Sequence, residues 1–174
     1  EDRWIEKVLD KVWKVQWQHL DDFSPQELLG ILGPRDALLL QRMLPEERFA
    51  MMAETYGAKV ERLSFPLGHG ADPDAVRKAL QRNPHIKAVL VTHNDTSTAV
   101  ANDLAAIAKV VKGEFGKLLL VDAVSSAACI PLDIDRWGCD VVATASQKGF
   151  MAPPGIGIIA ISPQGWEAHR NAKM

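Results

Sequence analysis

The sequence has few cysteines, no excess of either charge and no long apolar run, and each absence excludes a class of protein. Its 174 residues include two cysteines. The 20 Lys and Arg residues are nearly balanced by 22 Asp and Glu residues, so the formal net charge is −2. This balance provides no electrostatic basis for binding nucleic acid or an anionic membrane surface. No apolar stretch approaches the roughly 20 residues of a membrane-spanning helix. The acidic start Glu1-Asp2-Arg3-Trp4 does not resemble a signal peptide.

Metal-binding and dinucleotide-binding motifs are missing as well. The five histidines are scattered without the spacing of metal ligands, so we predict no metal site. Gly155-Ile156-Gly157 lacks the third glycine of a dinucleotide fingerprint. Cys129 and Cys139 have no ligand pattern around them, and we expect them in the core or at strand edges of a protein in a reducing compartment. The cytoplasm is the expected location.

What is present is a globular composition, 47% hydrophobic and 24% charged, with enough chain to bury a sizeable core. Residues 1–33 form a helical segment in this interpretation. Val8, Val12 and Val15 recur at helical spacing, and Ser24-Pro25-Gln26-Glu27 has the pattern of a capped helix start. Residues 34–174 then form a separate α/β core.

Within this core, short apolar runs alternate with helical patterns that begin near Pro45, Pro73 and Thr98. This order predicts an α/β fold with a mainly parallel sheet flanked by helices. The predicted strands are Ala37 to Leu40, Lys59 to Phe65, Ile86 to Thr92, Leu118 to Val121, Asp140 to Ala145 and Ile156 to Ile161.

Sheets of this kind place their chemistry beyond the carboxyl ends of the strands. Three segments fall there: His93-Asn94-Asp95-Thr96-Ser97-Thr98, Asp122 with Val124-Ser125-Ser126, and Ser146-Gln147-Lys148-Gly149. Each has an ordinary alternative when taken singly. Lys148 can be a solvated loop lysine, Asp122 can cap the turn that follows it, and the hydroxyls of 96–98 can cap a helix.

Taken together, a lysine, an acid and a cluster of hydroxyls fit a cofactor with a carbonyl, a basic ring nitrogen and a phosphate. A lysine near apolar strand ends can attack a carbonyl to form a Schiff base. A buried aspartate can hold a pyridine nitrogen protonated. Hydroxyls at a helix start can bind the ring oxygen or a phosphate. Pyridoxal 5′-phosphate has all three groups.

These segments also resemble those of a known family. The sequence from Ser146 to Gly155, SQKGFMAPPG, is similar to the cofactor-lysine segment of the class V, fold type I aminotransferases. Within that family it looks most like the serine–glyoxylate and alanine–glyoxylate group. The segments 121–126 and 93–98 resemble the family's pyridine-nitrogen aspartate segment and the loop under the cofactor ring, in the family's order and at about its spacing.

The resemblance implies a role for each matching residue. Lys148 would attach pyridoxal phosphate and move a proton between the substrate Cα and the cofactor. Asp122 would pair with the ring nitrogen, and Thr96 would bond the ring oxygen. Val124 would pack on one ring face, Gln147 would contact the phosphate edge, and Asp95 would stand behind them. The implied reaction moves an amino group from serine or alanine to glyoxylate or pyruvate, in a homodimer or larger assembly.

The sequence departs from the family at several positions. The segment His19 to Gln26 contains no glycine where the family has a glycine-rich phosphate turn, and the segment 41–45 has no aromatic to stack on the ring. Ala99 replaces the usual glycine, and the family's C-terminal small domain does not follow. The alternative is therefore a catalytically incomplete relic that serves as a scaffold, an interaction protein or a weak binder of pyridoxal phosphate.

Overall fold

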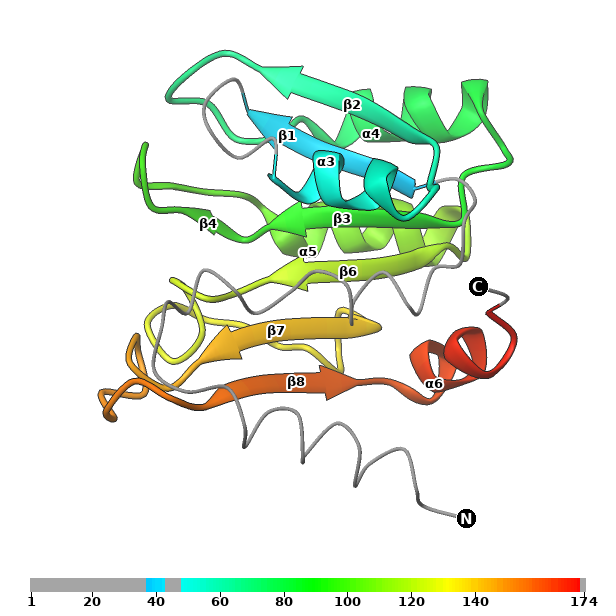
Figure 1. Ribbon diagram of the computed structural model, residues 1–174. Coiled ribbons are helices and arrows are strands. Elements are labelled where there is room, and N and C mark those ends of the chain that lie inside the picture. Colours follow the sequence, from blue (N-terminus) through cyan, green and yellow to red (C-terminus); the bar gives the residue numbers. More distant parts are fainter. Residues whose placement is uncertain (1–36, 43–47, 173–174) are drawn as a thin grey trace.

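The computed structural model describes residues 37–42 and 48–172. The predicted N-terminal helices within 1–33 lie outside the described residues. In the described part, six strands form one sheet in the order β2-β1-β3-β6-β7-β8 (Figure 1). The first five strands in this order are parallel, and β8 alone runs antiparallel, against β7. The mainly parallel sheet predicted from the sequence is thereby confirmed.

All six strands of the sheet coincide with predicted apolar runs, with ends that differ by at most two residues. They are β1 (Ala37–Arg42), β2 (Val60–Phe65), β3 (Ala88–Thr92), β6 (Leu118–Asp122), β7 (Val141–Ala145) and β8 (Gly157–Ile161). The central strands β3 and β6 are apolar over nearly their whole length because both of their faces are covered.

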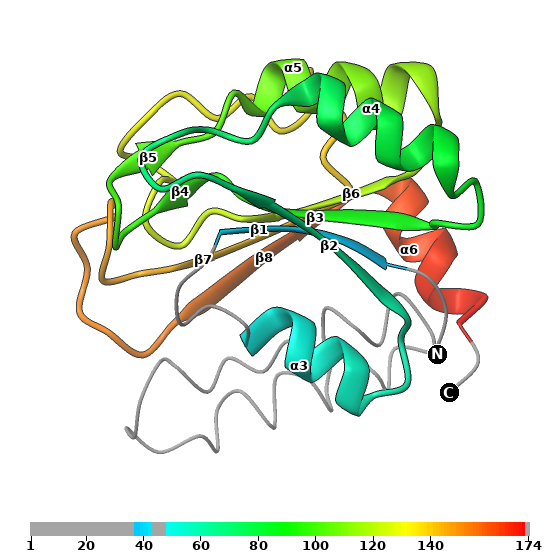
Figure 2. The same cartoon turned by 90° about the horizontal axis from the view of Figure 1, so that it is seen from above.

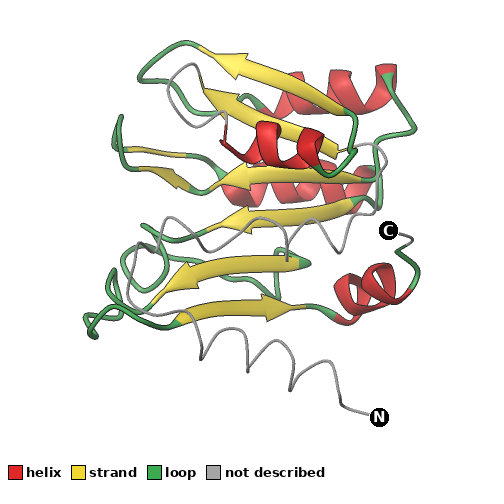
Figure 3. Cartoon of the chain, viewed as in Figure 1, coloured by secondary structure: helices red, strands yellow, loops and turns green. Residues whose placement is uncertain are grey.

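Helices cover both faces of the sheet (Figures 2 and 3). The helices α4 (Pro73–Arg82) and α5 (Leu104–Ala108), continued by the π-helical turn η2 (Lys109–Glu114), lie on one face. On the other face lies α3 (Arg48–Thr55), and Ala168 of α6 (Pro163–Arg170) packs against the core of that same face.

Alternate strand residues build these two core layers. Val89 and Val91 of β3 point to the face of α4 and α5, whereas Ala88 and Leu90 point to the face of α3. Among the described residues, alanines are four of the seven buried residues of the second layer, whereas most buried residues of the first layer have larger side chains. The period of two along β3 is what places consecutive residues in different layers.

Two parts of the sequence prediction need correction or addition. The helix expected near Thr98 begins at Leu104, where the Asp103 side chain caps it by accepting a hydrogen bond from the N–H of Ala106 at 2.9 Å. The residues before it form a short antiparallel hairpin of β4 (Asn94–Asp95) and β5 (Val100–Ala101). Helix α6 was not predicted, although Ser162 followed by Pro163 is a typical helix start.

The other helix starts agree better with the sequence. Helix α4 begins at the predicted Pro73 with Asp72 as its cap. The described part of α3 begins at Arg48, and Pro45 lies outside the described residues. Of the two cysteines, Cys139 is buried as expected, but Cys129 is exposed in a turn, so its assignment to the core or a strand edge is wrong. Neither forms a disulfide.

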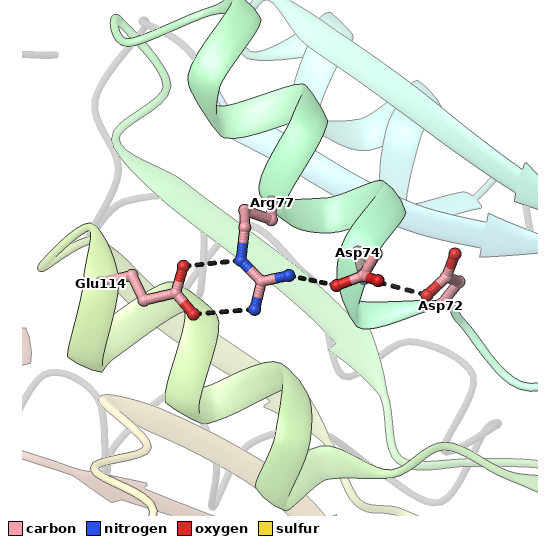
Figure 4. A network of polar contacts seen from close by, with 4 residues as sticks. All are labelled: Asp72, Asp74, Arg77 and Glu114. Atoms are coloured by element: carbon pink, nitrogen blue, oxygen red, sulfur yellow. Dashed lines mark hydrogen bonds and ion pairs between the residues drawn. The ribbon is translucent and has the colours of Figure 1, made fainter.

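One polar network joins two helical elements to each other, and a second joins helical elements to the sheet. Arg77 on α4 bonds both carboxylate oxygens of Glu114 on η2, at 2.6 and 2.8 Å, and also contacts Asp74 (Figure 4). At the amino end of β7, the buried Asp140 carboxylate accepts hydrogen bonds from Lys112 Nζ at 2.6 Å, from the N–H of Leu119 at 2.8 Å and from Ser162 Oγ at 2.8 Å. Asp140 therefore joins η2, β6 and the start of α6.

No helix in the described ranges combines the length and the hydropathy that crossing a membrane requires.

Candidate functional site

The three predicted chemical segments meet at one edge of the sheet. Strands β3, β6 and β7 are neighbours and parallel, so the residues that follow them emerge on the same side. In Figure 1 the loops after these strands gather at the left of the molecule. The structure thereby brings the segments that carry Thr96, Asp122 and Lys148 to a common edge.

Asp122 is the last residue of β6 and lies in register between Thr92 of β3 and Ala143 of β7. Its Oδ1 accepts a hydrogen bond from the N–H of Val124 at 2.9 Å, so it does cap the turn that follows. Burial raises the pKa of the Asp122 carboxyl, and the bond from Val124 opposes this only in part. A cation placed near this carboxyl would lower its pKa and favour the ionised form.

Lys148 is exposed on the loop that follows β7. Hydrogen bonds from Ser146 Oγ to the carbonyl of Pro153 at 2.7 Å and from the N–H of Met151 to the carbonyl of Lys148 at 2.9 Å fold this loop back on itself. These bonds fix the backbone of Lys148 while its side chain stays accessible.

Gly149 brings the Lys148 loop into direct contact with the turn after Asp122. A Cβ at position 149 would lie 2.2 Å from the carbonyl oxygen of Ala127 and 2.7 Å from Cys129 Sγ. Only glycine permits this approach, since no real Cβ comes so close to a backbone oxygen. The sequence analysis did not identify this role of Gly149, and only the neighbouring turn reveals it.

Gln147 has a buried amide oxygen without a hydrogen-bond partner among the described residues. Such groups are rare in folded proteins because an unpaired buried polar atom is costly. Amide oxygen and nitrogen positions are interchangeable by a flip of the side chain. Gln147 can therefore turn a donor or an acceptor towards a ligand next to Lys148.

The hairpin β4–β5 carries Thr96 in its exposed turn. Asp95 is buried and organises this turn by accepting bonds from the N–H of Ser97 at 2.9 Å, from Ser97 Oγ and from Thr98 Oγ1. The hydroxyls therefore belong to a hairpin turn and not to a helix start. This corrects the expectation that they lie at a helix N-terminus, while Thr96 itself remains available to a ligand.

Hydrogen bonds between the loops after β3 and β6 were also not predicted. His93 and Ser126 are both buried, and His93 Nδ1 lies 3.1 Å from Ser126 Oγ. Asn94 and Ser125 form a second pair beside them. The sequence pattern places these serines at the sheet edge, but its spacing does not indicate which histidine or asparagine they contact. No group of three or more potential metal ligands occurs in the described part of the chain.

The residues at this edge fit pyridoxal phosphate. The structure provides an accessible lysine, an aspartate whose pKa burial raises, and a buried amide oxygen in need of a partner. Lys148 could attach the cofactor aldehyde, Asp122 could hold the ring nitrogen, and Gln147 and Thr96 could bond its oxygens.

Solved structures share this fold. The chain superposes on an alanine–glyoxylate aminotransferase from Nostoc sp. with a TM-score of 0.77 and 30% identity, over 84% of this chain and 39% of that chain. The architecture is therefore the sheet-and-helix core of these aminotransferases.

The family follows from the sequence match. The model of the aminotransferase class-V family matches residues 45–173, and the chain belongs to this family. An L-aspartate–glyoxylate aminotransferase of Paracoccus denitrificans is 36% identical over 151 residues, which are 84% of this chain and 38% of that protein. A protein of Anabaena cylindrica described as the 42 kDa subunit of a soluble hydrogenase is 41% identical over 150 residues, 84% of this chain and 39% of that protein. The chain spans about two fifths of the length of these relatives.

Proposed function

We propose that this chain is the cofactor-binding core of a pyridoxal-phosphate-dependent aminotransferase that acts on serine or alanine and on glyoxylate or pyruvate. One observation carries the proposal: the Lys148 loop packs through Gly149 directly on the turn that follows Asp122. The names of related proteins support the reaction and the class of substrates, since several are glyoxylate aminotransferases. Amino acids and 2-oxo acids are the proposed small-molecule partners.

Each residue has a distinct proposed role. Lys148 would hold the cofactor covalently and would hold and move the proton at the substrate Cα. When bound, pyridoxal phosphate supplies the electron sink for that proton transfer. Val124 packs on a ring face, Thr96 bonds the ring oxygen, and Gln147 contacts the phosphate edge.

Asp122 has the role for which its environment is best suited. Because burial raises its pKa, the ionised carboxylate is poorly stabilised until a cation lies beside it. A protonated ring nitrogen is such a cation, and its charge would lower the pKa of Asp122 while the carboxylate keeps the nitrogen protonated. The aspartate thereby maintains the ring in its electron-accepting form.

A second candidate is a binding module without turnover. The exposed apolar side chains of Phe150, Met151 and Ile156 follow Lys148 in the same connection, and exposed apolar patches mark interaction surfaces. In this alternative the chain keeps the family fold as a scaffold, an interaction protein or a weak cofactor binder.

Reductive labelling separates the two. The chain is incubated with pyridoxal phosphate, reduced with borohydride and mapped by peptide mass spectrometry. We expect the label on Lys148 alone, and transfer of an amino group from alanine to glyoxylate would then support the enzyme. Equal labelling of other exposed lysines such as Lys87 and Lys109 would contradict the proposal, because it is the result of nonspecific aldehyde chemistry. Labelling of Lys148 without amino transfer would favour the binding module.

Three wider properties belong to the same proposal. The division into an N-terminal helical segment, 1–33, and an α/β core, 34–174, rests on the sequence pattern. A homodimer or larger assembly is supported by the exposed apolar loop after Lys148. A cytoplasmic location is supported by Cys129 and Cys139, which are both free thiols.

A further inference from the structure

A set of hydrogen bonds joins the loops after β3 and β6, next to the proposed cofactor site but without a role in it so far. His93 Nδ1 and Ser126 Oγ lie 3.1 Å apart. Asn94 Nδ2 donates to Ser125 Oγ at 3.1 Å, and Ser125 Oγ donates to the carbonyl oxygen of Asn94 at 2.7 Å. We call these three contacts the β3–β6 staple. His93 and Ser126 are only 4% and 1% exposed, so water does not compete for their contact.

Backbone hydrogen bonds connect the residues of the staple to Asp122 and to the turn that follows it. At one end, the N–H of His93 donates to the carbonyl oxygen of Asp122 at 2.8 Å. At the other end, the N–H of Ser126 donates to the carbonyl oxygen of Ala123 at 3.1 Å. Between them, the N–H of Val124 donates to Asp122 Oδ1. The turn that orients the Asp122 carboxylate is therefore anchored on both sides by His93.

The histidine is suited to a fixed structural bond. Burial lowers the pKa of His93, so its ring is neutral at physiological pH and carries one donor and one acceptor nitrogen. The edge of the ring packs against Trp137 at a centroid distance of 6.2 Å with planes 80° apart, which fixes its orientation. Nδ1 is thereby held towards Ser126.

We propose that His93 and Ser126 are positioning residues that hold the Asp122 carboxylate in the orientation in which it accepts the Val124 N–H and faces the cofactor edge. This inference rests on the proposed function only in assigning the Asp122 carboxylate to the cofactor. The orientation of the carboxylate itself is a property of the chain without cofactor. Without the contact between His93 and Ser126, the 123–126 turn loses its buried side-chain anchor to the loop after β3, and Asp122 Oδ1 separates from the Val124 N–H.

Amide hydrogen exchange of the cofactor-free, full-length chain measures this directly. In Ser126→Ala we expect the Val124 N–H to exchange about fivefold faster, the effect of one lost hydrogen bond. The Gly165 N–H, which donates to Ser162 Oγ near the opposite ends of the strands, should keep its exchange rate. Thr144→Val is the matched control, because it removes a buried hydroxyl that has no hydrogen-bond partner among the described residues. It should change neither amide.

A second pair of variants keeps the test decisive if Ser126→Ala does not fold. His93→Asn places an amide nitrogen where Nδ1 lies and should retain slow exchange at Val124, whereas His93→Leu should not. If the Val124 and Gly165 amides exchanged faster by the same factor, the variant would only have lowered the stability of the whole chain, and the proposal would be overturned. An unchanged exchange rate of the Val124 amide in both Ser126→Ala and His93→Leu would overturn it as well. Borohydride labelling of Lys148, run separately, reports on the proposed function. If the exchange results are as expected but Lys148 is not labelled, the positioning role of His93 and Ser126 stands and the proposed enzymatic function does not.

Discussion

The burial of Asp122, a candidate site residue, opposes the stability of the fold when its carboxyl is ionised. Its pKa is raised by burial, so the folded chain holds the proton at Asp122 more tightly than the unfolded chain does. Stability must then fall as the pH rises through the interval between the unfolded pKa, near 3.8, and the higher folded value. Above that interval the folded chain carries the full cost of the ionised carboxylate.

Asp122→Asn removes this ionisation and keeps an oxygen that can accept the Val124 N–H. We expect the variant to be more stable than the wild type at pH 7 in the absence of cofactor, with the difference shrinking as the pH falls towards 4. Urea unfolding at a series of pH values measures both effects. A variant less stable than the wild type at pH 7 would show that another contact of the carboxylate outweighs its burial.

Ala99 occupies a backbone conformation that suits glycine. It lies in the turn of the β4–β5 hairpin with φ of 55°, where an L side chain costs about 1–2 kcal/mol. Ala99→Gly should relieve this strain, but the more flexible glycine loses more entropy on folding. The expected net gain is about 0.5–1 kcal/mol, read from the midpoint of urea unfolding. Ala105→Gly, at an exposed position inside α5, is the control and should lose about the same amount.

At the scale of secondary-structure elements, the sequence predicted the strands well and the connections poorly. Strands β3 and β6 are continuous apolar runs because both of their faces are covered, and this signal is local. The hairpin after β3 depends instead on Asp95, whose carboxylate gathers Ser97 and Thr98 into a turn. The same hydroxyls suit a helix start, so the sequence pattern alone does not separate the two structures.

The meeting of the candidate site segments at one sheet edge was predictable for a related reason. Parallel neighbouring strands place their following residues at one edge, so Asp122 and Lys148 could be assigned to it from strand order. The contacts between their loops could not be assigned, since they depend on the close approach at Gly149 and on the pairing of His93 with Ser126. Both features depend on tertiary packing, which leaves no local pattern in the sequence.

Gly149→Ala tests whether the contact between these two loops holds Lys148 in place. The added methyl group meets the Ala127 carbonyl oxygen, which is backbone and cannot rotate away, so the loop must shift. We expect a loss of about 1–3 kcal/mol in the free energy of unfolding, typical of overpacking, together with weaker borohydride labelling of Lys148.

Gly113→Ala is the matched control for this substitution. Gly113 lies in η2, and a Cβ there would have no heavy atom within 4 Å. Alanine should stabilise the chain by about 0.5–1 kcal/mol and leave the labelling unchanged. If Gly149→Ala behaved in the same way as this control, the proposed docking of the two loops would be contradicted.

At the scale of the whole molecule, the two edges of the sheet differ in what they expose. Strand β2 forms one edge and β8 the other. The connection from β7 to β8 exposes Met151 to 91% and Ile156 to 60%, and Phe150 in the same connection is also partly accessible. Exposed apolar side chains on one connection are typical of an interaction surface. A second copy of the chain is the partner that the homodimer proposal requires.

The double variant Met151→Lys with Ile156→Lys should weaken self-association without unfolding the chain. Two charges placed in a buried apolar contact remain unpaired there, and we expect the dimer dissociation constant to rise by about tenfold or more. Sedimentation velocity over a range of concentrations measures it, with circular dichroism as the check on folding. Leu67→Lys is the control, because Leu67 is 55% exposed in the loop after β2, the edge strand opposite β8. Equal weakening by Leu67→Lys would show that the contact between the copies does not depend on the β7–β8 connection. A wild-type chain that stays monomeric at every concentration would contradict the homodimer proposal, because the β7–β8 connection would then stay exposed to solvent.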